Sequence, residues 1–145
     1  MNRVLEVNKD LKYRFEIIEK YEAGIELLGY EVKAMKNNKF SIDKAYGRFQ
    51  KGELFLINMY IKAEGPWRKS ETRPRKLLLH KYEIIRIATK VKEKGLTILP
   101  YEVYVNSRGL IKVTIALVKG KKIFERREQI KQRDMERKIR SFYRY

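Results

Sequence analysis

The amino-acid sequence predicts a mainly β domain followed by a basic C-terminal tail. Short segments rich in aromatic and β-branched residues recur along the first 118 residues, which is typical of strands. Two intervals between such segments, 50–52 and 106–109, have the composition of hairpin turns. The last 27 residues carry eleven basic and four acidic side chains and lack the apolar density of a core.

The first elements lie in residues 13–37. Residues 13–21 alternate aromatic and β-branched side chains with polar ones, and this predicts a strand. The apolar segment 24–29 follows it directly. Residues 32–37 are compatible with a short helix that ends near Asn38.

Two hairpins follow along the chain. The segments 45–49 and 53–61 flank the turn at 50–52, which contains a glycine. The segments 96–105 and 110–117 flank the turn at 106–109, where glycine is able to adopt a positive φ. We therefore expect two antiparallel strand pairs.

A helix is predicted between the two hairpins. In residues 81–94, Ile84, Ile85, Ala88 and Val91 share one helical face, and Gly95 follows as a stop signal. His80 stands at the expected start of this helix, where a capping or surface position is the ordinary interpretation.

Residues 62–76 form the one long interval without a regular pattern. Six of its fifteen residues are basic, and it contains the single tryptophan, Trp67. A long loop in an ordered domain is more often functional or mobile than idle. Two interpretations remain open: a solvated, flexible loop, or a segment that contacts RNA directly.

Together these elements favour a small antiparallel β-barrel of the oligonucleotide-binding type, closed or nearly closed, with two or three packed helices. We divide the chain into a barrel domain, 1–118, and a basic tail, 119–145, with formal charges of +10 and +7. Like-charge crowding should keep the tail from forming a stable helix alone, so we expect it to be disordered when free and to fold on a polyanion. A permanently disordered arm and a membrane-surface helix are the alternatives.

Composition excludes several functional classes. The chain of 145 residues has no cysteine and one histidine, so it has no disulfide, no thiolate zinc site and no cysteine nucleophile. No phosphate-binding glycine loop or nucleophile elbow occurs, and we expect a protein that is not an enzyme and needs no metal or cofactor. The formal charge of +17 indicates a polyanionic partner. With no membrane span or leader sequence, we expect a cytoplasmic protein.

Several blocks, taken together and in order, resemble the SmpB family, whose members bind transfer-messenger RNA (tmRNA, also called SsrA RNA) in bacterial ribosome rescue. The blocks that carry the resemblance are Tyr-Glu-Ala-Gly-Ile at 21–25, Gly-Tyr-Glu-Val-Lys at 29–33, Arg-Pro-Arg-Lys-Leu-Leu-Leu-His at 73–80, Val-Lys-Glu-Lys-Gly-Leu-Thr at 91–97, Leu-Val-Lys-Gly-Lys-Lys at 117–122 and Lys-Gln-Arg-Asp at 131–134.

The resemblance implies that the barrel grips the tRNA-like domain of tmRNA. The residues it implicates are Asn8, Lys9, Glu22, Arg73, Arg75, Lys76, Leu77, Leu78 and Leu79. A carboxylate such as Glu22 repels phosphate but accepts hydrogen bonds from base N–H groups, which favours contact with a base edge. Leu78 would pack under a splayed base. A strand salt bridge for Glu22 and core burial for Leu78 are the alternatives.

The resemblance also implies that the tail enters the decoding centre and the empty messenger channel of a stalled 70S ribosome, where it contacts 16S ribosomal RNA. The tail residues implicated are Lys119, Lys121, Lys122, Phe124, Glu125, Arg126, Arg127, Lys131 and Arg133. We thus expect a monomeric tmRNA-binding adaptor for trans-translation, linked indirectly to elongation factor Tu. The rival hypothesis is a structural ribosomal protein with a basic extension.

Overall fold

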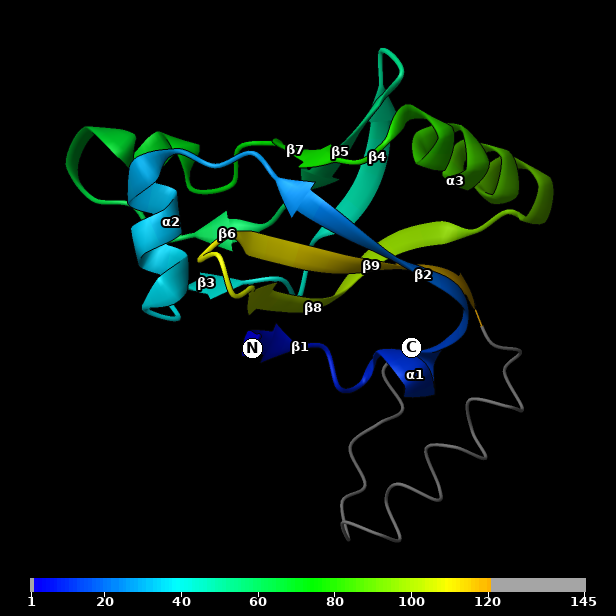
Figure 1. Ribbon diagram of the computed structural model, residues 1–145, viewed down its shortest axis with the longest axis horizontal. Helices are drawn as coiled ribbons and strands as arrows, with labels where there is room; N and C mark the ends of the chain where they lie inside the picture. The colour runs from blue at the N-terminus through cyan, green and yellow to red at the C-terminus, as the bar shows by residue number, and fades with distance from the viewer. Residues whose placement is uncertain (1, 121–145) are drawn as a thin grey trace, which may run out of the picture.

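Three α-helices and nine short strands make up the computed structural model, which describes residues 2–120 and, for residues 67–69, the backbone alone (Figure 1). Residues 121–145 of the predicted tail lie outside the described residues. The expectation that the free tail is disordered therefore stays a prediction. The elements in chain order are β1 (Arg3–Val7), α1 (Leu11–Arg14), β2 (Phe15–Ile25), α2 (Gly29–Lys36), β3 (Phe40–Ser41), β4 (Tyr46–Gln50), β5 (Glu53–Ile57), β6 (Tyr60–Ile61), the 3-10 helix η1 (Gly65–Ser70), β7 (Arg75–Leu78), α3 (Lys81–Lys94), β8 (Thr97–Val105) and β9 (Ile111–Gly120).

Seven strands form one antiparallel sheet in the order β1-β8-β9-β2-β7-β5-β4, and β3 pairs with β6 separately. The sheet curls until β4 packs against β8, although no backbone ladder joins these two strands within residues 2–120. The predicted barrel of the oligonucleotide-binding type is therefore nearly closed. At the contact, a Cβ built on Gly47 would lie 2.6 Å from Ile98 Cγ2, so the approach of β4 to β8 requires glycine.

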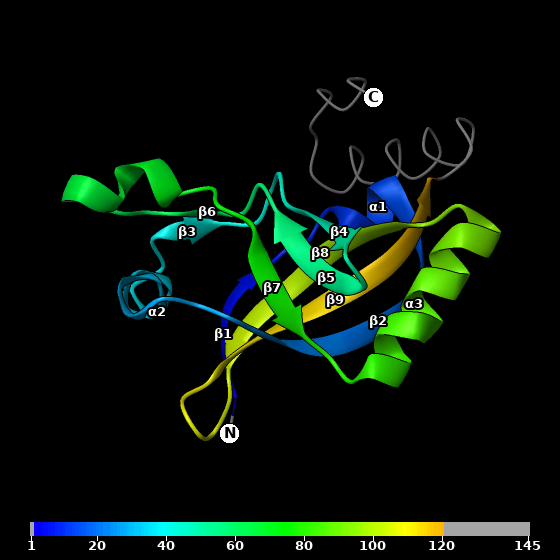
Figure 2. The same cartoon turned by 90° about the horizontal axis from the view of Figure 1, so that it is seen from above.

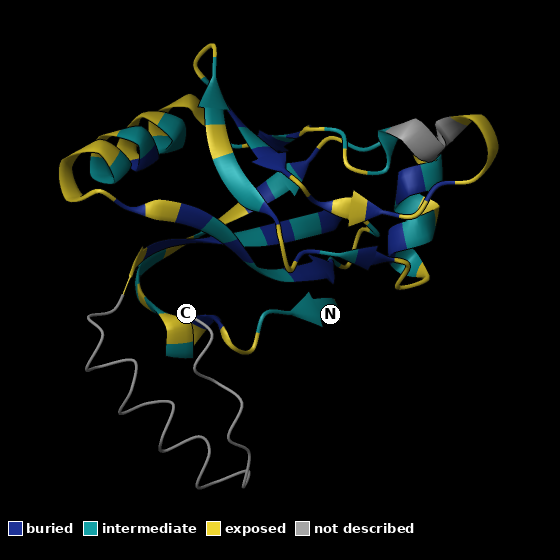
Figure 3. Ribbon diagram, turned by 180° about the vertical axis from the view of Figure 1, so that it is seen from behind, coloured by how far each residue is buried: buried dark blue, intermediate teal, exposed yellow. Residues whose placement is uncertain are grey.

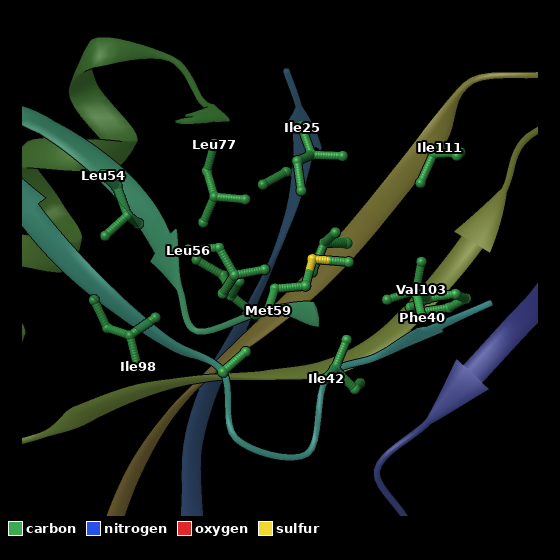
Figure 4. Packing of buried hydrophobic residues seen from close by; sticks show 14 of the residues in the cluster. Ile25, Phe40, Ile42, Leu54, Leu56, Met59, Leu77, Ile98, Val103 and Ile111 are labelled. Carbon is green, nitrogen blue, oxygen red and sulfur yellow. The ribbon is translucent and has the colours of Figure 1, made fainter. Parts of the chain in front are cut away.

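The core fills the inside of this curled sheet (Figure 4). Side chains of β2, β3, β5, β7, β8 and β9 and of the β5–β6 connection point toward one another there, with Leu56, Met59, Leu77 and Ile98 at most 3% exposed. A smaller cluster covers the other face of β8 and β9, where Leu11 of α1 packs with buried side chains of β9 and partly buried side chains of β8. Figure 3 shows the buried strands inside and the exposed face of α3 outside.

The local predictions are largely confirmed, with three corrections. Both hairpins and the helix at 81–94 are present, and Gly95 caps that helix with φ 62°. The segment 53–61 is broken at Asn58, whose φ of 62° ends β5 before β6 begins. The interval 62–76 contains η1 and the start of β7, a strand that the sequence did not predict. The short helix begins at Gly29 rather than at residue 32.

Candidate nucleic-acid interface

A surface groove of about 1010 Å³ lies where β2, β7, the β4–β5 turn and the start of α3 meet. In Figure 2, β7 leads into the first turn of α3, and α3 runs alongside β2. The residues that line the groove are Glu22, Gly24, Lys51, Gly52, Glu53, Lys76, Leu77, Leu78, Leu79, His80, Lys81, Tyr82, Glu83, Ile84 and Lys112. The structure therefore brings together five of the nine predicted tmRNA-binding residues, from two segments about fifty residues apart.

Alternation along β7 decides which of those residues reach the surface. Successive side chains of a strand point to opposite faces. Arg75 and Leu77 point inward and are 0% and 1% exposed, whereas Leu78 is 48% exposed and Lys76 is partly exposed. The side chains of Arg75 and Leu77 therefore do not reach the surface, and the expectation that these residues contact tmRNA stays a prediction.

Gly24 of β2 brings the exposed leucine of β7 close to the neighbouring strand. Gly24 is paired with Leu78 in the β2–β7 ladder. A Cβ built on Gly24 would lie 3.2 Å from Leu78 Cβ, which is closer than most real contacts between such atoms. The Glu-Ala-Gly block thus places the Glu22 carboxylate and the apolar surface of Leu78 on neighbouring strands of one groove. Core burial of Leu78 is excluded.

The Glu22 side chain is exposed and is held by one neighbour. The Tyr104 hydroxyl of β8 donates a hydrogen bond to Glu22 Oε2. Within residues 2–120, Glu22 forms no salt bridge, so the alternative interpretation of this residue is also excluded there. A carboxylate accepts up to about four hydrogen bonds, and the Tyr104 contact therefore leaves acceptor capacity in the groove.

Four lysines line the groove that contains this acceptor. Lys51, Lys81 and Lys112 line the groove together with Lys76. The Lys76 ammonium lies 2.6 Å from Glu53 Oε2, and this hydrogen bond raises the pKa of Lys76. The groove thus combines four lysines, the exposed apolar side chain of Leu78 and three carboxylates, of which Glu53 is paired with Lys76. This combination is suitable for RNA backbone and base contacts.

A buried ion network lies behind β7 and holds it to α2. Arg75 Nη2 is 2.6 Å from Glu31 Oε2, and both side chains are 0% exposed. Arg73 Nη2 is 2.5 Å from Glu31 Oε1 at the edge of the same network. Arg75 also donates to the carbonyl oxygens of Met59, Ser70 and Glu71. The guanidinium of Arg75 therefore ties β7 to α2, to the β5–β6 connection and to the end of η1.

The pKa of Glu31 reflects this network. Burial alone would raise it, but hydrogen bonds from Arg73, the Leu28 N–H and Arg75 outweigh burial and hold the pKa below its ordinary value. Arg73 is therefore placed in the network, and it does not line the groove. Its side chain is 29% exposed, so its contact with tmRNA stays a prediction, at a place outside the groove.

The other predicted residues lie elsewhere. Asn8 and Lys9 connect β1 to α1, where the Asn8 N–H donates to the Tyr101 carbonyl at 2.8 Å. In Figure 1, β2 and β9 run between this connection and α3, so these two residues do not share the groove. Lys119 is exposed near the end of β9. The remaining tail residues, from Lys121 to Arg133, lie outside the described residues.

Sequence reasoning missed several groove residues. Lys51 and Lys112 come from turns and strands whose neighbours only the sheet order reveals. Tyr82 is 61% exposed on α3, an exposure that marks it in the structure but not in the sequence. Within the described residues, no group of three or more potential ligands is arranged to hold a metal ion, and no helix has the length and apolarity to cross a membrane.

Comparison with known proteins identifies the family. The family model described as SmpB protein matches residues 5–145. The SsrA-binding protein of Thermosipho africanus is 47% identical over 143 residues, covering 97% of this chain and 96% of that protein. The SsrA-binding protein of Moorella thermoacetica is 45% identical and covers 94% and 90%.

A solved structure agrees with these relatives. A chain in the structure described as "tmRNA-SmpB: a journey to the center of the bacterial ribosome" superposes with a TM-score of 0.69 at 39% identity, covering 88% of this chain and 94% of that one. Sequence identity and fold thus agree over most of the length. The chain belongs to the SmpB family.

Proposed function

We propose that this protein is the tmRNA-binding adaptor of trans-translation, which binds the tRNA-like domain of tmRNA and delivers it to stalled ribosomes. One observation carries the proposal: the fold gathers Glu22, Lys76, Leu78 and Leu79 into one groove. The relatives named SsrA-binding protein support the RNA, and the ribosome structure with a similar chain supports the destination.

The groove divides the work of recognition between charge and hydrogen bonding. The lysines that line it attract the phosphate backbone whatever the sequence. Glu22 cannot contribute to that attraction, because its charge has the wrong sign. It adds selectivity instead, by accepting hydrogen bonds from base N–H groups, while Leu78 packs against the base beneath.

The tail supplies the second contact of the adaptor. Lys119, Lys121, Lys122, Phe124, Glu125, Arg126, Arg127, Lys131 and Arg133 extend into the decoding centre and the empty messenger channel, against 16S ribosomal RNA. Asn8 and Lys9 remain part of the proposed tmRNA contact on the barrel. The protein acts as a monomer in the bacterial cytoplasm, and elongation factor Tu joins through the charged tmRNA.

The sign of one mutational effect tests this proposal. Glu22→Ala raises the formal charge by one, so general electrostatics predict tighter RNA binding. Loss of a charged acceptor from a base contact predicts binding to the tRNA-like domain weakened roughly ten- to hundredfold. Glu16→Ala, on the same strand and outside the groove, is the matched control for charge. Equal or tighter binding by Glu22→Ala at matched salt would remove Glu22 from the interface.

A further inference from the structure

We propose that His80 and Tyr82 form a stacking platform for one unpaired nucleobase of the bound RNA. This subsite rests on the proposed function and deepens it, because it adds a base contact at one end of the groove to the acceptor at Glu22. The ligand class is a single flat heteroaromatic base, held by its face rather than by its edge.

The two rings are already arranged for stacking. The His80 and Tyr82 ring centroids are 5.4 Å apart with an interplanar angle of 9°. Both residues line the groove, and Tyr82 is 61% exposed. Both side chains are exposed among residues 2–120, so a ligand can reach the two rings.

The backbone beneath the platform is fixed. His80 is the N-cap of α3, and its N–H donates to Glu83 Oε1 at 3.0 Å. The Glu83 N–H donates in turn to the His80 carbonyl at 2.9 Å. A platform on a capped helix end is positioned before the ligand arrives, which lowers the entropy cost of binding.

The surroundings of the rings select RNA as the occupant. Arg86 lies on the next turn of α3 with its guanidinium 5.9 Å from the Tyr82 ring centroid, and Lys81 and Lys112 line the same groove. Aromatic faces interleaved with cations are the arrangement with which proteins bind unpaired nucleotides. The exposed Leu78 side chain, two residues before His80, adds apolar surface to the groove that also contains Glu22.

Titration of the full-length protein with the isolated tRNA-like domain tests the inference. Tyr82→Ala should weaken binding between about 5-fold and 100-fold, the range for loss of one base stack. Tyr82→Phe should bind within about twofold of the original protein, because stacking uses the ring and not the hydroxyl. Ile85→Ala, which truncates another exposed side chain of α3 outside the groove, is the matched control.

The salt dependence separates stacking from charge. Loss of a stack removes no phosphate contact, so the slope of log Kd against log salt should be unchanged in Tyr82→Ala. Lys112→Ala should lower that slope by about 0.7–0.9 if Lys112 contacts a phosphate. Tyr82→Gln repeats the test with a good helix former, and circular dichroism verifies that each variant is folded.

The inference is overturned if Tyr82→Ala and Tyr82→Gln bind like Ile85→Ala, if Tyr82→Phe loses as much affinity as Tyr82→Ala, or if the slope falls. Failure of the proposed function has a different signature. In that case the original protein would bind the tRNA-like domain no better than an unrelated RNA of equal length, and Glu22→Ala would not weaken binding.

Discussion

Replacing Glu31 by glutamine tests whether the buried ion network stabilises the part of the fold that supports the groove. The substitution keeps the size and a carbonyl acceptor but removes the only carboxylate that faces Arg73 and Arg75 within residues 2–120. Arg75 then keeps its charge in a fully buried position, where only neutral acceptors remain: the glutamine carbonyl and the backbone carbonyl oxygens of Met59, Ser70 and Glu71.

The magnitude follows from this burial. Removing one partner of a buried ion pair costs about 3–5 kcal/mol, because the other charge stays desolvated and unpaired. Because the backbone carbonyl acceptors still contact Arg75, we expect Glu31→Gln to lower the free energy of unfolding by about 3 kcal/mol, the lower end of this range. That is a large fraction of an ordinary unfolding free energy of about 5–15 kcal/mol, and it lowers Tm by roughly 6–12 °C.

Two further variants calibrate the result. Arg73 is 29% exposed, so Arg73→Gln should cost about 1 kcal/mol or less after allowance for solvent screening. The double variant Glu31→Gln with Arg75→Met removes the stranded charge and should be more stable than Glu31→Gln alone.

Urea unfolding of the full-length proteins, followed by circular dichroism at neutral pH, measures all of these differences. The reasoning is refuted if Glu31→Gln unfolds within about 1 kcal/mol of the original protein, or if the double variant is no more stable than the single one.

Four other predictions complete the set. The pKa of Glu31 is lowered in the folded protein from its ordinary value of 4.5, so its contribution to stability is present above that pH and is lost as the pH falls through the folded value; acid titration of the unfolding free energy should be flatter in Glu31→Gln. Gly47→Ala should destabilise the barrel by about 1–3 kcal/mol in urea, because the new methyl meets Ile98; an unchanged midpoint would contradict the close approach. Tyr104→Phe removes the hydroxyl that holds Glu22 and should weaken binding to the tRNA-like domain several-fold in filter binding, roughly the effect of one hydrogen bond, without unfolding the chain; full affinity would show that Glu22 needs no such support. Deletion after Gly120 should preserve that binding and abolish peptide tagging on stalled ribosomes in a translation extract; tagging by the truncated chain would refute the role of the tail.

Local signals allowed the hairpins and α3 to be predicted. Each depends on neighbours in sequence: Gly95 after the apolar face of α3, and the turn residues between strands of matching length. β7 was missed because its four residues begin with Arg75 and Lys76, which resemble a solvated loop. Arg75 is buried only because Glu31, 44 residues earlier, neutralises it, and pairing at that distance has no local signature.

The candidate site could likewise be predicted only in part from the sequence. The resemblance to a family identified Glu22 and the Lys-Leu-Leu-Leu block at 76–79, but not which alternate residues of β7 face outward. Once β7 is known to be a strand, its period of two assigns Lys76 and Leu78 to the groove and Arg75 and Leu77 to the core. Lys51, Lys112 and Tyr104 join the groove or support it through the order of the sheet, which requires the assembled fold.

Recovery of the RNA bound to the full-length protein in bacterial cells tests the central claim most directly. Ultraviolet crosslinking, a high-salt wash and sequencing of the attached RNA should return tmRNA, with crosslinks concentrated in its tRNA-like domain and reduced in Glu22→Ala. A structural ribosomal protein would give the contrary result: ribosomal RNA retained at one copy per subunit after the wash, with no enrichment of tmRNA.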